Sequence, residues 1–243
     1  MIIPDFHLPL SFLGQFGDAF HFILHKQDAR TGGGLAQVGG PHQVLELAKE
    51  QLKVTALALA LSLAVALPPG LWLGHRGRGE RLAISIGNAG RAIPELALIA
   101  FMAAVIGVGL GNLTIALAVL GVPPILTNTY VGISQVDRGA VDAARGMGMT
   151  ESGIVRKVEL PLAVPTVMSG VRTATINIVA TATIAPLAGI LTLGDFIIAR
   201  DVYGDEGVIA GAILVALLAL TLELALAGLQ WALTSPGLRA KQG

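Results

Sequence analysis

The sequence predicts an all-α integral membrane protein with five transmembrane helices. Of its 243 residues, 53% are hydrophobic and only 13% are charged, whereas soluble domains usually carry about 25% charged residues. The apolar residues also fall into long uncharged stretches, and a helix needs about 20 mostly apolar residues to cross the hydrocarbon core of a bilayer. A soluble core could not hide so much apolar surface in a chain of this length, so we expect it to lie in a membrane.

The first 45 residues precede the predicted spans. Residues 12–24 are apolar and include aromatic side chains, but about 13 residues are too few to cross a bilayer. We therefore expect an interfacial helix, or one that packs on a partner. Residues 31–41 are rich in glycine and are predicted to form a flexible linker. Residues 42–53 place apolar and charged side chains at helical spacing and should lead into the first span. Residues 1–45 are thus assigned to an extracytoplasmic or interfacial segment.

The first three spans are separated by charge and by glycine. Residues 54–73 form an uncharged run of 20 residues and give the first span. The next uncharged stretch is too long for one helix, and the glycines at 107–112 divide it. The second span is predicted to run from about Leu82, past Pro94, to this break. The third span is predicted to run from Leu113 to Ser134.

Two further spans complete the transmembrane domain. The fourth span should begin near Leu162 and reach Gly194, and its uncharged part covers residues 173–194. The fifth runs from 207 to 233 and is interrupted only by Glu223. The transmembrane domain is therefore predicted to occupy residues 46–235, with a tail at 236–243.

The distribution of basic residues predicts the orientation, because Lys and Arg accumulate in short cytoplasmic loops. With five spans, three basic segments fall on one side of the membrane. The loop after the first span carries Arg76, Arg78 and Arg81, and the segment between the third and fourth spans carries Arg138, Arg145, Arg156 and Lys157. The carboxyl-terminal tail carries Arg239 and Lys241. The opposite loops carry only Arg200. The amino terminus is therefore predicted to lie outside, and segment 135–161 and the carboxyl terminus in the cytoplasm.

Segment 135–161 has the pattern of two short helices. Residues 137–149 read as one helix with Asp142 in its middle, flanked by small residues that permit close approach by another protein. Gly148 fits a helix stop, because glycine accepts the left-handed conformation. Residues 151–159 predict a second short helix, and Pro161 suits the first turn of the next span, where a missing N–H costs little.

The spacing in this segment resembles the signature of permeases of ABC importers, which is Glu-Ala-Ala, three residues, Gly, nine residues and Ile-x-Leu-Pro. Asp for Glu and Val for Ile are the only departures. The resemblance implies a type I ABC importer permease fold with a cytoplasmic coupling helix, which in that family seats in a cleft of the ATPase subunit. We call 135–161 the coupling segment. The residues that the resemblance assigns to ATPase coupling are Asp142, Ala143, Ala144, Gly148, Val158, Leu160 and Pro161. Among these, Asp142 would hydrogen-bond or ion-pair with the ATPase.

Further motifs look like the permeases for glycine betaine, carnitine and choline. These motifs lie at residues 124–133, 146–149, 170–175 and 180–183. The chain departs from that subfamily at Thr127, where its members usually have Arg, and at 189–194, where they usually carry a Gly-Ala-Gly-Gly-Leu-Gly run. The resemblance implies import of a quaternary ammonium osmoprotectant. A permease for another small solute, such as the amino acid methionine, is the alternative within the same class.

The resemblance also implies partners. These are ABC ATPase subunits, a second permease subunit that is identical or related, an extracytoplasmic substrate-binding protein and the lipid of a prokaryotic inner membrane. The chain has no G-x-x-x-x-G-K-[ST] sequence, so we expect ATP and Mg to be bound by the partner ATPase and this chain to be a non-catalytic transport subunit without a cofactor. A formal net charge of zero argues against nucleic acid.

Polar side chains inside the spans have two possible roles. Asn128, Thr129, Asn177, Thr181 and Thr183 could line a translocation path, or they could hydrogen-bond between helices, as such residues more often do. A second polar group lies before the spans. Asp18, His21 and His25 share one helical face, and we interpret them as a polar face rather than a metal site.

Glu223 needs separate treatment because an ionisable residue inside a span is costly and is by default a functional hypothesis. It could relay protons in a secondary transporter, or it could pair with Arg172 or Arg91. Many secondary transporters contain an inverted repeat, and we find none in this sequence. The pairing interpretation is therefore favoured, with a proton-coupled carrier as the alternative from another class.

Overall fold

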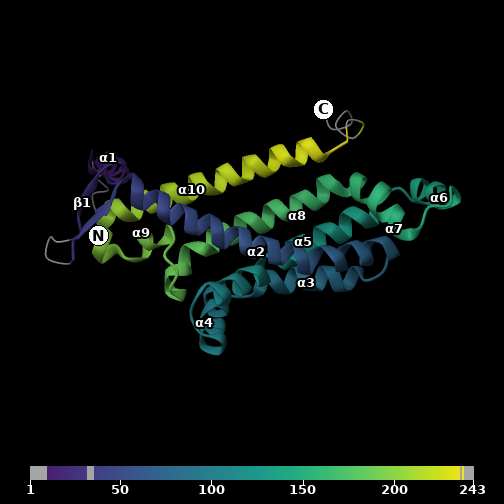
Figure 1. Cartoon of the computed structure of the whole chain (residues 1–243), viewed down its shortest axis with the longest axis horizontal. Coiled ribbons are helices and arrows are strands. Elements are labelled where there is room, and N and C mark those ends of the chain that lie inside the picture. Colours follow the sequence, from purple (N-terminus) through teal and green to yellow (C-terminus); the bar gives the residue numbers. More distant parts are fainter. Residues whose placement is uncertain (1–9, 32–35, 236, 238–243) are drawn as a thin grey trace, which may run out of the picture.

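Long helices lying side by side make up most of the molecule (Figure 1). The computed structural model describes residues 10–31, 36–235 and 237. Its elements in chain order are α1 (Leu10–Leu24), β1 (Lys26–Asp28), β2 (Gln37–Gly39), α2 (Gly40–Arg76), α3 (Glu80–Ala92), α4 (Glu95–Ile106), α5 (Leu110–Ser134), α6 (Arg138–Gly146), α7 (Glu151–Ile154), the π-helical turn η1 (Val155–Glu159), α8 (Leu160–Thr181), the 3₁₀ helix η2 (Ala182–Ala188), α9 (Gly194–Ile198) and α10 (Arg200–Leu233).

Four of the five predicted spans are continuous helices, and the fifth is present if one bent pair of helices is counted as a span. Within the described residues, four helices are long and apolar enough to cross a membrane, namely Gly40–Arg76, Leu110–Ser134, Glu151–Ala188 and Arg200–Leu233. The fifth candidate is the pair α3 and α4, which bend by 88° relative to each other.

The prediction that the second span continues as one helix past Pro94 is wrong. The backbone is extended at Ile93 (φ −74°, ψ 120°) and at Pro94 (φ −68°, ψ 113°). A proline ring clashes with a helical conformation of the residue before it, and proline has no N–H to donate to the preceding turn. The sequence therefore ends α3 at Ala92 and begins α4 at Glu95 in a new direction.

The amino-terminal segment folds onto the end of α10. Helix α1 forms as predicted and packs against α10, where Phe22, Phe196 and Tyr203 meet edge to face with ring centroids 5.0–6.2 Å apart. The prediction of a flexible linker at 31–41 is wrong for its second half, because β2 pairs with β1 in an antiparallel hairpin, with Gln27 opposite Val38. Residues 1–9 and 32–35 lie outside the described part of the chain.

Helix α5 lies at the centre of the bundle and contacts α2, α3, α4 and α8. Two glycines bring α2 close to it. A Cβ atom added at Gly70 would lie 2.8 Å from the Thr129 Cβ, and one added at Gly74 would lie 2.7 Å from the Ile133 Cβ. Helices in membranes associate mainly through such close packing at small residues, because lipid offers no hydrophobic driving force between them.

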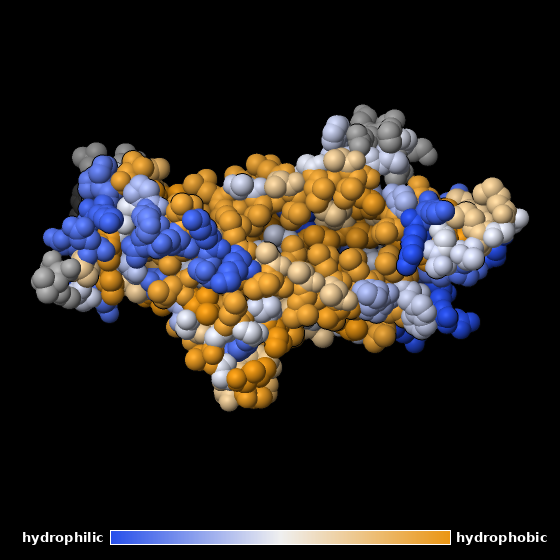
Figure 2. All heavy atoms as spheres, viewed as in Figure 1, coloured by the Kyte–Doolittle hydropathy of each residue, from blue (hydrophilic) through white to orange (hydrophobic). Residues whose placement is uncertain are grey.

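The two ends of the bundle differ in what they carry. Helix α1, the hairpin and α9 gather at one end, whereas α6 and α7 lie at the other, toward which the carboxyl end of α10 also points (Figure 1). Hydrophobic residues cover the middle of the face shown in Figure 2, and hydrophilic residues concentrate at both ends. This arrangement suits a bundle that crosses a bilayer; the side of the membrane on which each end lies remains a prediction. Most of the predicted tail, residues 236 and 238–243, lies outside the described part.

The close contact between α2 and α5 gives a stability prediction. We expect Gly74→Ala to lower the free energy of unfolding by about 1–3 kcal/mol, because the new methyl group overlaps Ile133. The measurement is the thermal unfolding midpoint of the purified protein in detergent. The matched control is Gly228→Ala on α10, where an added Cβ meets no atom within 4 Å. A midpoint for Gly74→Ala at or above that of the control would contradict this account of the packing.

Candidate functional site

The apolar contacts of helix α6 with the end of the bundle come from one face. Its amino terminus is capped by Asp137, whose Oδ1 accepts a hydrogen bond of 2.8 Å from the Gly139 N–H. Val141 and Ala144 are buried in an apolar cluster with Ile154 and with residues of α5 and α8. The opposite face of α6 is exposed. This amphipathic pattern leaves a short helix that protrudes from the bundle and presents a free surface.

The predicted stop of α6 at Gly148 is confirmed as a helix-ending turn with two backbone hydrogen bonds. The N–H of Gly148 donates to the Arg145 carbonyl (3.0 Å), and the N–H of Met149 donates to the Ala144 carbonyl (3.2 Å). This pair of bonds is the Schellman arrangement, which requires a left-handed residue, and Gly148 has φ +80°.

The predicted second short helix is not a separate element. Thr150 caps α7 by accepting a hydrogen bond from the Gly153 N–H (3.2 Å), but α7 continues through η1 directly into α8. In η1 the Leu160 N–H donates to the Val155 carbonyl, five residues back. Pro161 follows in the first turn of α8 and has no N–H to donate, so the wider π-helical turn accommodates it without breaking the helix.

The residues of the predicted coupling motif take different positions. The side chain of Asp142 is 72% exposed, and Ala143 and Gly148 are also exposed, whereas Ala144 is buried. Val158, Leu160 and Pro161 are half-buried, and Val158 packs on the apolar cluster under α6. The sequence interpretation missed Met147, an apolar side chain that is 77% exposed at the tip of the segment; the signal was its position just before Gly148.

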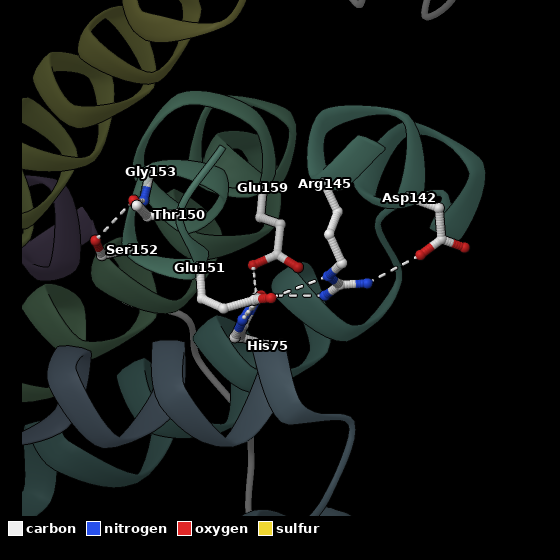
Figure 3. A network of polar contacts seen from close by, with 8 residues as sticks. All are labelled: His75, Asp142, Arg145, Thr150, Glu151, Ser152, Gly153 and Glu159. Atoms are coloured by element: carbon white, nitrogen blue, oxygen red, sulfur yellow. Dashed lines mark hydrogen bonds and ion pairs between the residues drawn. The ribbon is translucent and has the colours of Figure 1, made fainter. Parts of the chain in front are cut away.

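A chain of charged side chains joins α6 to α2 (Figure 3). Arg145 Nη1 lies 3.0 Å from Asp142 Oδ1, and Arg145 also donates to both carboxylate oxygens of Glu151, at 2.9 and 3.0 Å. Glu151 Oε2 lies 2.9 Å from His75 Nε2, and His75 Nδ1 lies 2.8 Å from Glu159 Oε2. Sequence interpretation missed His75, and it left Glu159 as the variable position of the Val158-x-Leu160 motif.

Arg145 is the fixed positive charge of this network. Its hydrogen bond to Glu151 is the largest cause that raises the pKa of Arg145 above its ordinary value, and the charges of Glu151 and Asp142 act in the same direction. The guanidinium therefore stays charged at any pH at which the protein is folded. Its fork-shaped donor set suits the two-oxygen contact with Glu151.

A second polar site lies in the middle of the bundle, where α3 ends. A cavity of about 340 Å³ opens between α3, α5 and α8, and its lining includes Glu95, Thr127, Asn128, Thr173 and Asn177. Two of the five predicted path residues, Asn128 and Asn177, are thus brought together here. The other three do not line this cavity. Thr129 is buried against Gly70, Thr181 is buried, and Thr183 donates its hydroxyl to the Ala180 carbonyl (2.7 Å).

Glu223 is paired. Arg172 Nε donates to Glu223 Oε1 at 2.9 Å, and Arg172 Nη1 donates to the Gln230 side chain at 2.9 Å. The pair joins α8 to α10, as the pairing interpretation expects; the side chain of Arg91 is outside the described part. At the other end of the molecule, His21 and His25 stack with ring centroids 4.5 Å apart, and the described residues contain no group of three potential metal ligands.

With this geometry in view, comparison with known proteins identifies the chain. The family model described as "Binding-protein-dependent transport system inner membrane component" matches residues 58–238. The chain belongs to this family. It is therefore a permease, a membrane component of a transport system that depends on a binding protein, and the matched region includes the whole coupling segment.

The chain is also similar to curated permeases. It is 38% identical over 191 residues to the choline transport system permease protein OpuBB of Bacillus subtilis (strain 168), covering 78% of this chain and 88% of that protein. It is 34% identical over 204 residues to the carnitine transport permease protein OpuCB of Listeria monocytogenes, covering 83% and 94%.

A solved structure shows the same fold. The inward-facing methionine ABC transporter MetNI contains a chain that matches this permease with a TM-score of 0.68 and 24% sequence identity, over 79% of this chain and 96% of that chain. The type I ABC importer permease fold predicted from the sequence is therefore confirmed. At 24% identity the match supports the fold and carries no information about the function.

The helix stop in the coupling segment gives the second prediction. We expect Gly148→Ala to increase the rate of tryptic cleavage within 138–149 about fivefold, because a side chain in the left-handed conformation costs about 1 kcal/mol or more. Gly146→Ala is the matched control, since an added Cβ meets no atom within 4 Å at either glycine and Gly146 has no positive φ. Equal cleavage of the two variants would show that the left-handed turn does not hold the end of α6.

Proposed function

We propose that this permease is the membrane-spanning subunit of an ATP-driven importer for a quaternary ammonium osmoprotectant such as glycine betaine, choline or carnitine. The observation that carries the proposal is the 38% identity over 78% of the chain to a protein named as a choline transport permease. A carnitine transport permease and a glycine betaine/carnitine/choline permease at 34% and 37% identity support the same class of substrate.

In this proposal the coupling segment is the point at which an ATPase subunit acts. Asp142 and Ala143 of α6, together with Met147 just after it, are exposed. They form a small and slightly apolar patch with one carboxylate, which suits a cleft in a partner. The partner ATPase binds ATP and Mg and performs the hydrolysis, and the permease transmits the motion to its spans. The end of the bundle that carries α6 then faces the cytoplasm, and the end that carries α1 faces outward, toward the binding protein.

The cavity lined by Asn128 and Asn177 is part of the proposed translocation path, which forms with a second permease subunit, identical or related. Amide and hydroxyl groups at a helix break suit a small, highly soluble solute, because they can replace part of its hydration. Helix α4 supports pairing, since it stands away from the bundle in Figure 1 and exposes Leu96, Phe101 and Val105.

The two alternatives have less support. Import of methionine would rest on the fold match to MetNI, whose 24% identity carries no substrate information. A proton-driven carrier would need Glu223 to exchange protons, but Arg172 donates to Glu223 Oε1 from two of its nitrogens. These contacts favour a structural role for Glu223 in joining α8 to α10.

The site of ATPase coupling can be tested by reversing one charge. We expect Asp142→Lys to abolish co-purification of the ATPase subunit and to lower substrate-stimulated ATP hydrolysis at least about tenfold, because an exposed carboxylate at an interface is replaced by the opposite charge. Glu46→Lys is the control, since Glu46 is similarly exposed on α2 near the opposite end of the molecule. If binding and stimulation both survived Asp142→Lys, the coupling assignment would be wrong.

The substrate class can be tested by uptake into proteoliposomes that contain the permease, its ATPase and its binding protein. We expect ATP-dependent uptake of radiolabelled glycine betaine, choline or carnitine that persists when an ionophore dissipates the proton gradient. Methionine should neither be taken up nor compete. Uptake of methionine in place of the quaternary ammonium compounds would contradict the substrate class, and uptake without ATP that collapsed with the proton gradient would contradict the mechanism.

A further inference from the structure

His75 occupies the last turn of α2 and meets a carboxylate on each side of its ring. Its Nδ1 lies 2.8 Å from Glu159 in η1, and its Nε2 lies 2.9 Å from Glu151 in α7. The side chain is only 14% exposed. A neutral imidazole has one N–H, whereas an imidazolium has two. Both contacts can therefore be charge-assisted hydrogen bonds only when His75 is protonated.

Glu159 depends on this histidine. Its side chain is 0% exposed, and within the described residues its Oε1 has no hydrogen-bond partner. A buried carboxylate is strongly destabilising unless a positive group compensates its charge. The π-helical turn places Glu159 at this position, because an extra residue in one turn changes the direction of the side chains that follow. The local distortion of η1 and the buried ion pair are thus parts of one feature.

The other carboxylate connects His75 to the exposed helix. Glu151 accepts two hydrogen bonds from Arg145 of α6 while it contacts His75. Chain connectivity ties α6 to α5 before it and to α7 and α8 after it, but nothing in the sequence ties it to α2. Leu67 and Leu71 of α2 pack on the cluster under α6, and the Arg138 side chain approaches Gly77 at the end of α2. Among the ion pairs of the described residues, the series Arg145–Glu151–His75 connects α6 to the first span.

We propose that His75 is a positioning residue that makes the coupling segment and α2 move as one body. The inference rests on the proposed function, in which α6 receives the motion of the ATPase. Helix α2 is itself locked against α5 at Gly70 and Gly74, so a displacement of α6 that reaches α2 through His75 also moves the centre of the bundle. Without this link α6 can tilt on its apolar contacts, and ATP hydrolysis is no longer matched by transport.

The connection depends on whether His75 is protonated, because only an imidazolium has an N–H for each of the two carboxylates. A cavity of about 790 Å³ reaches the imidazole, so protons have access to it. The charged groups around His75 or on the walls of this cavity are Glu151 on α7, Glu159 and Arg156 in η1, Arg145 on α6 and Arg76 on α2. Deprotonation removes one of the two hydrogen bonds and leaves a ring lone pair facing a carboxylate, so the link weakens as pH rises.

The experiment measures molecules transported per ATP hydrolysed by the complete complex in proteoliposomes, from about pH 6 to about pH 8. For the wild type we expect the ratio to fall as pH rises. His75→Gln should lower the ratio at least about fivefold at the acidic end and remove the pH dependence, while the ATPase still co-purifies. His42→Gln is the control, since His42 lies on the same helix and is 78% exposed; it should behave as the wild type does.

A second variant covers the case in which His75→Gln fails to fold. Glu151→Gln breaks the same series without uncovering a buried charge, because the Glu151 side chain is 57% exposed, and it should also lower the ratio about fivefold. A wild-type ratio and pH profile in either folded variant would overturn the inference. If Asp142→Lys still abolished ATPase binding, the proposed function would survive that result; absence of any ATP-dependent uptake by the wild type would instead contradict the proposed function itself.

Discussion

The close approach of α2 to α5 is the constraint on which the rest of the structure depends. Gly70 and Gly74 allow the two helices to come so near that a methyl group at either position would overlap Thr129 or Ile133. This contact fixes the rotation of α2 about its axis, because only one face of the helix carries these glycines. His75 directly follows Gly74, so the same rotation determines where its side chain points. The ion pair with Glu159 is therefore possible only because the helices are already in contact.

The polar side chains of the two sites described above differ in what they contact. Around α6 the charges satisfy one another, from Asp142 through Arg145 and Glu151 to His75. Such a network fixes geometry, since each group accepts or donates in a set direction. At the break between α3 and α4 the polar side chains line a cavity. Thr127 and Asn128 donate to backbone carbonyls there, and Asn177 is exposed. The first arrangement suits transmission of force, and the second suits contact with a passing solute.

The sequence predicted the features that have local causes. Hydrophobic length predicted the spans, and the glycine at 148 predicted the end of α6, because both depend on residues within a few positions of one another. The kink at Pro94 also had a local cause, and the interpretation missed it because the uncharged stretch was weighed above the proline rule. The hairpin of β1 and β2 was missed because glycine-rich sequence is equally typical of a linker and of a tight turn.

The network at His75 could not have been predicted from the sequence, because it joins residues 75, 151 and 159 from segments that only the packing of α2 on α5 brings together. The same network also bears on the exchange of Glu for Asp in the coupling motif. Arg145 directs two of its donors to Glu151 and only one to Asp142. The contact of Arg145 with Asp142 is therefore the weaker of the two. An exposed carboxylate with a single, shared partner is free to turn toward a cation on another protein. Asp142 is therefore available for the contact with an ATPase that we propose, while Glu151 and His75 link the helix to α2.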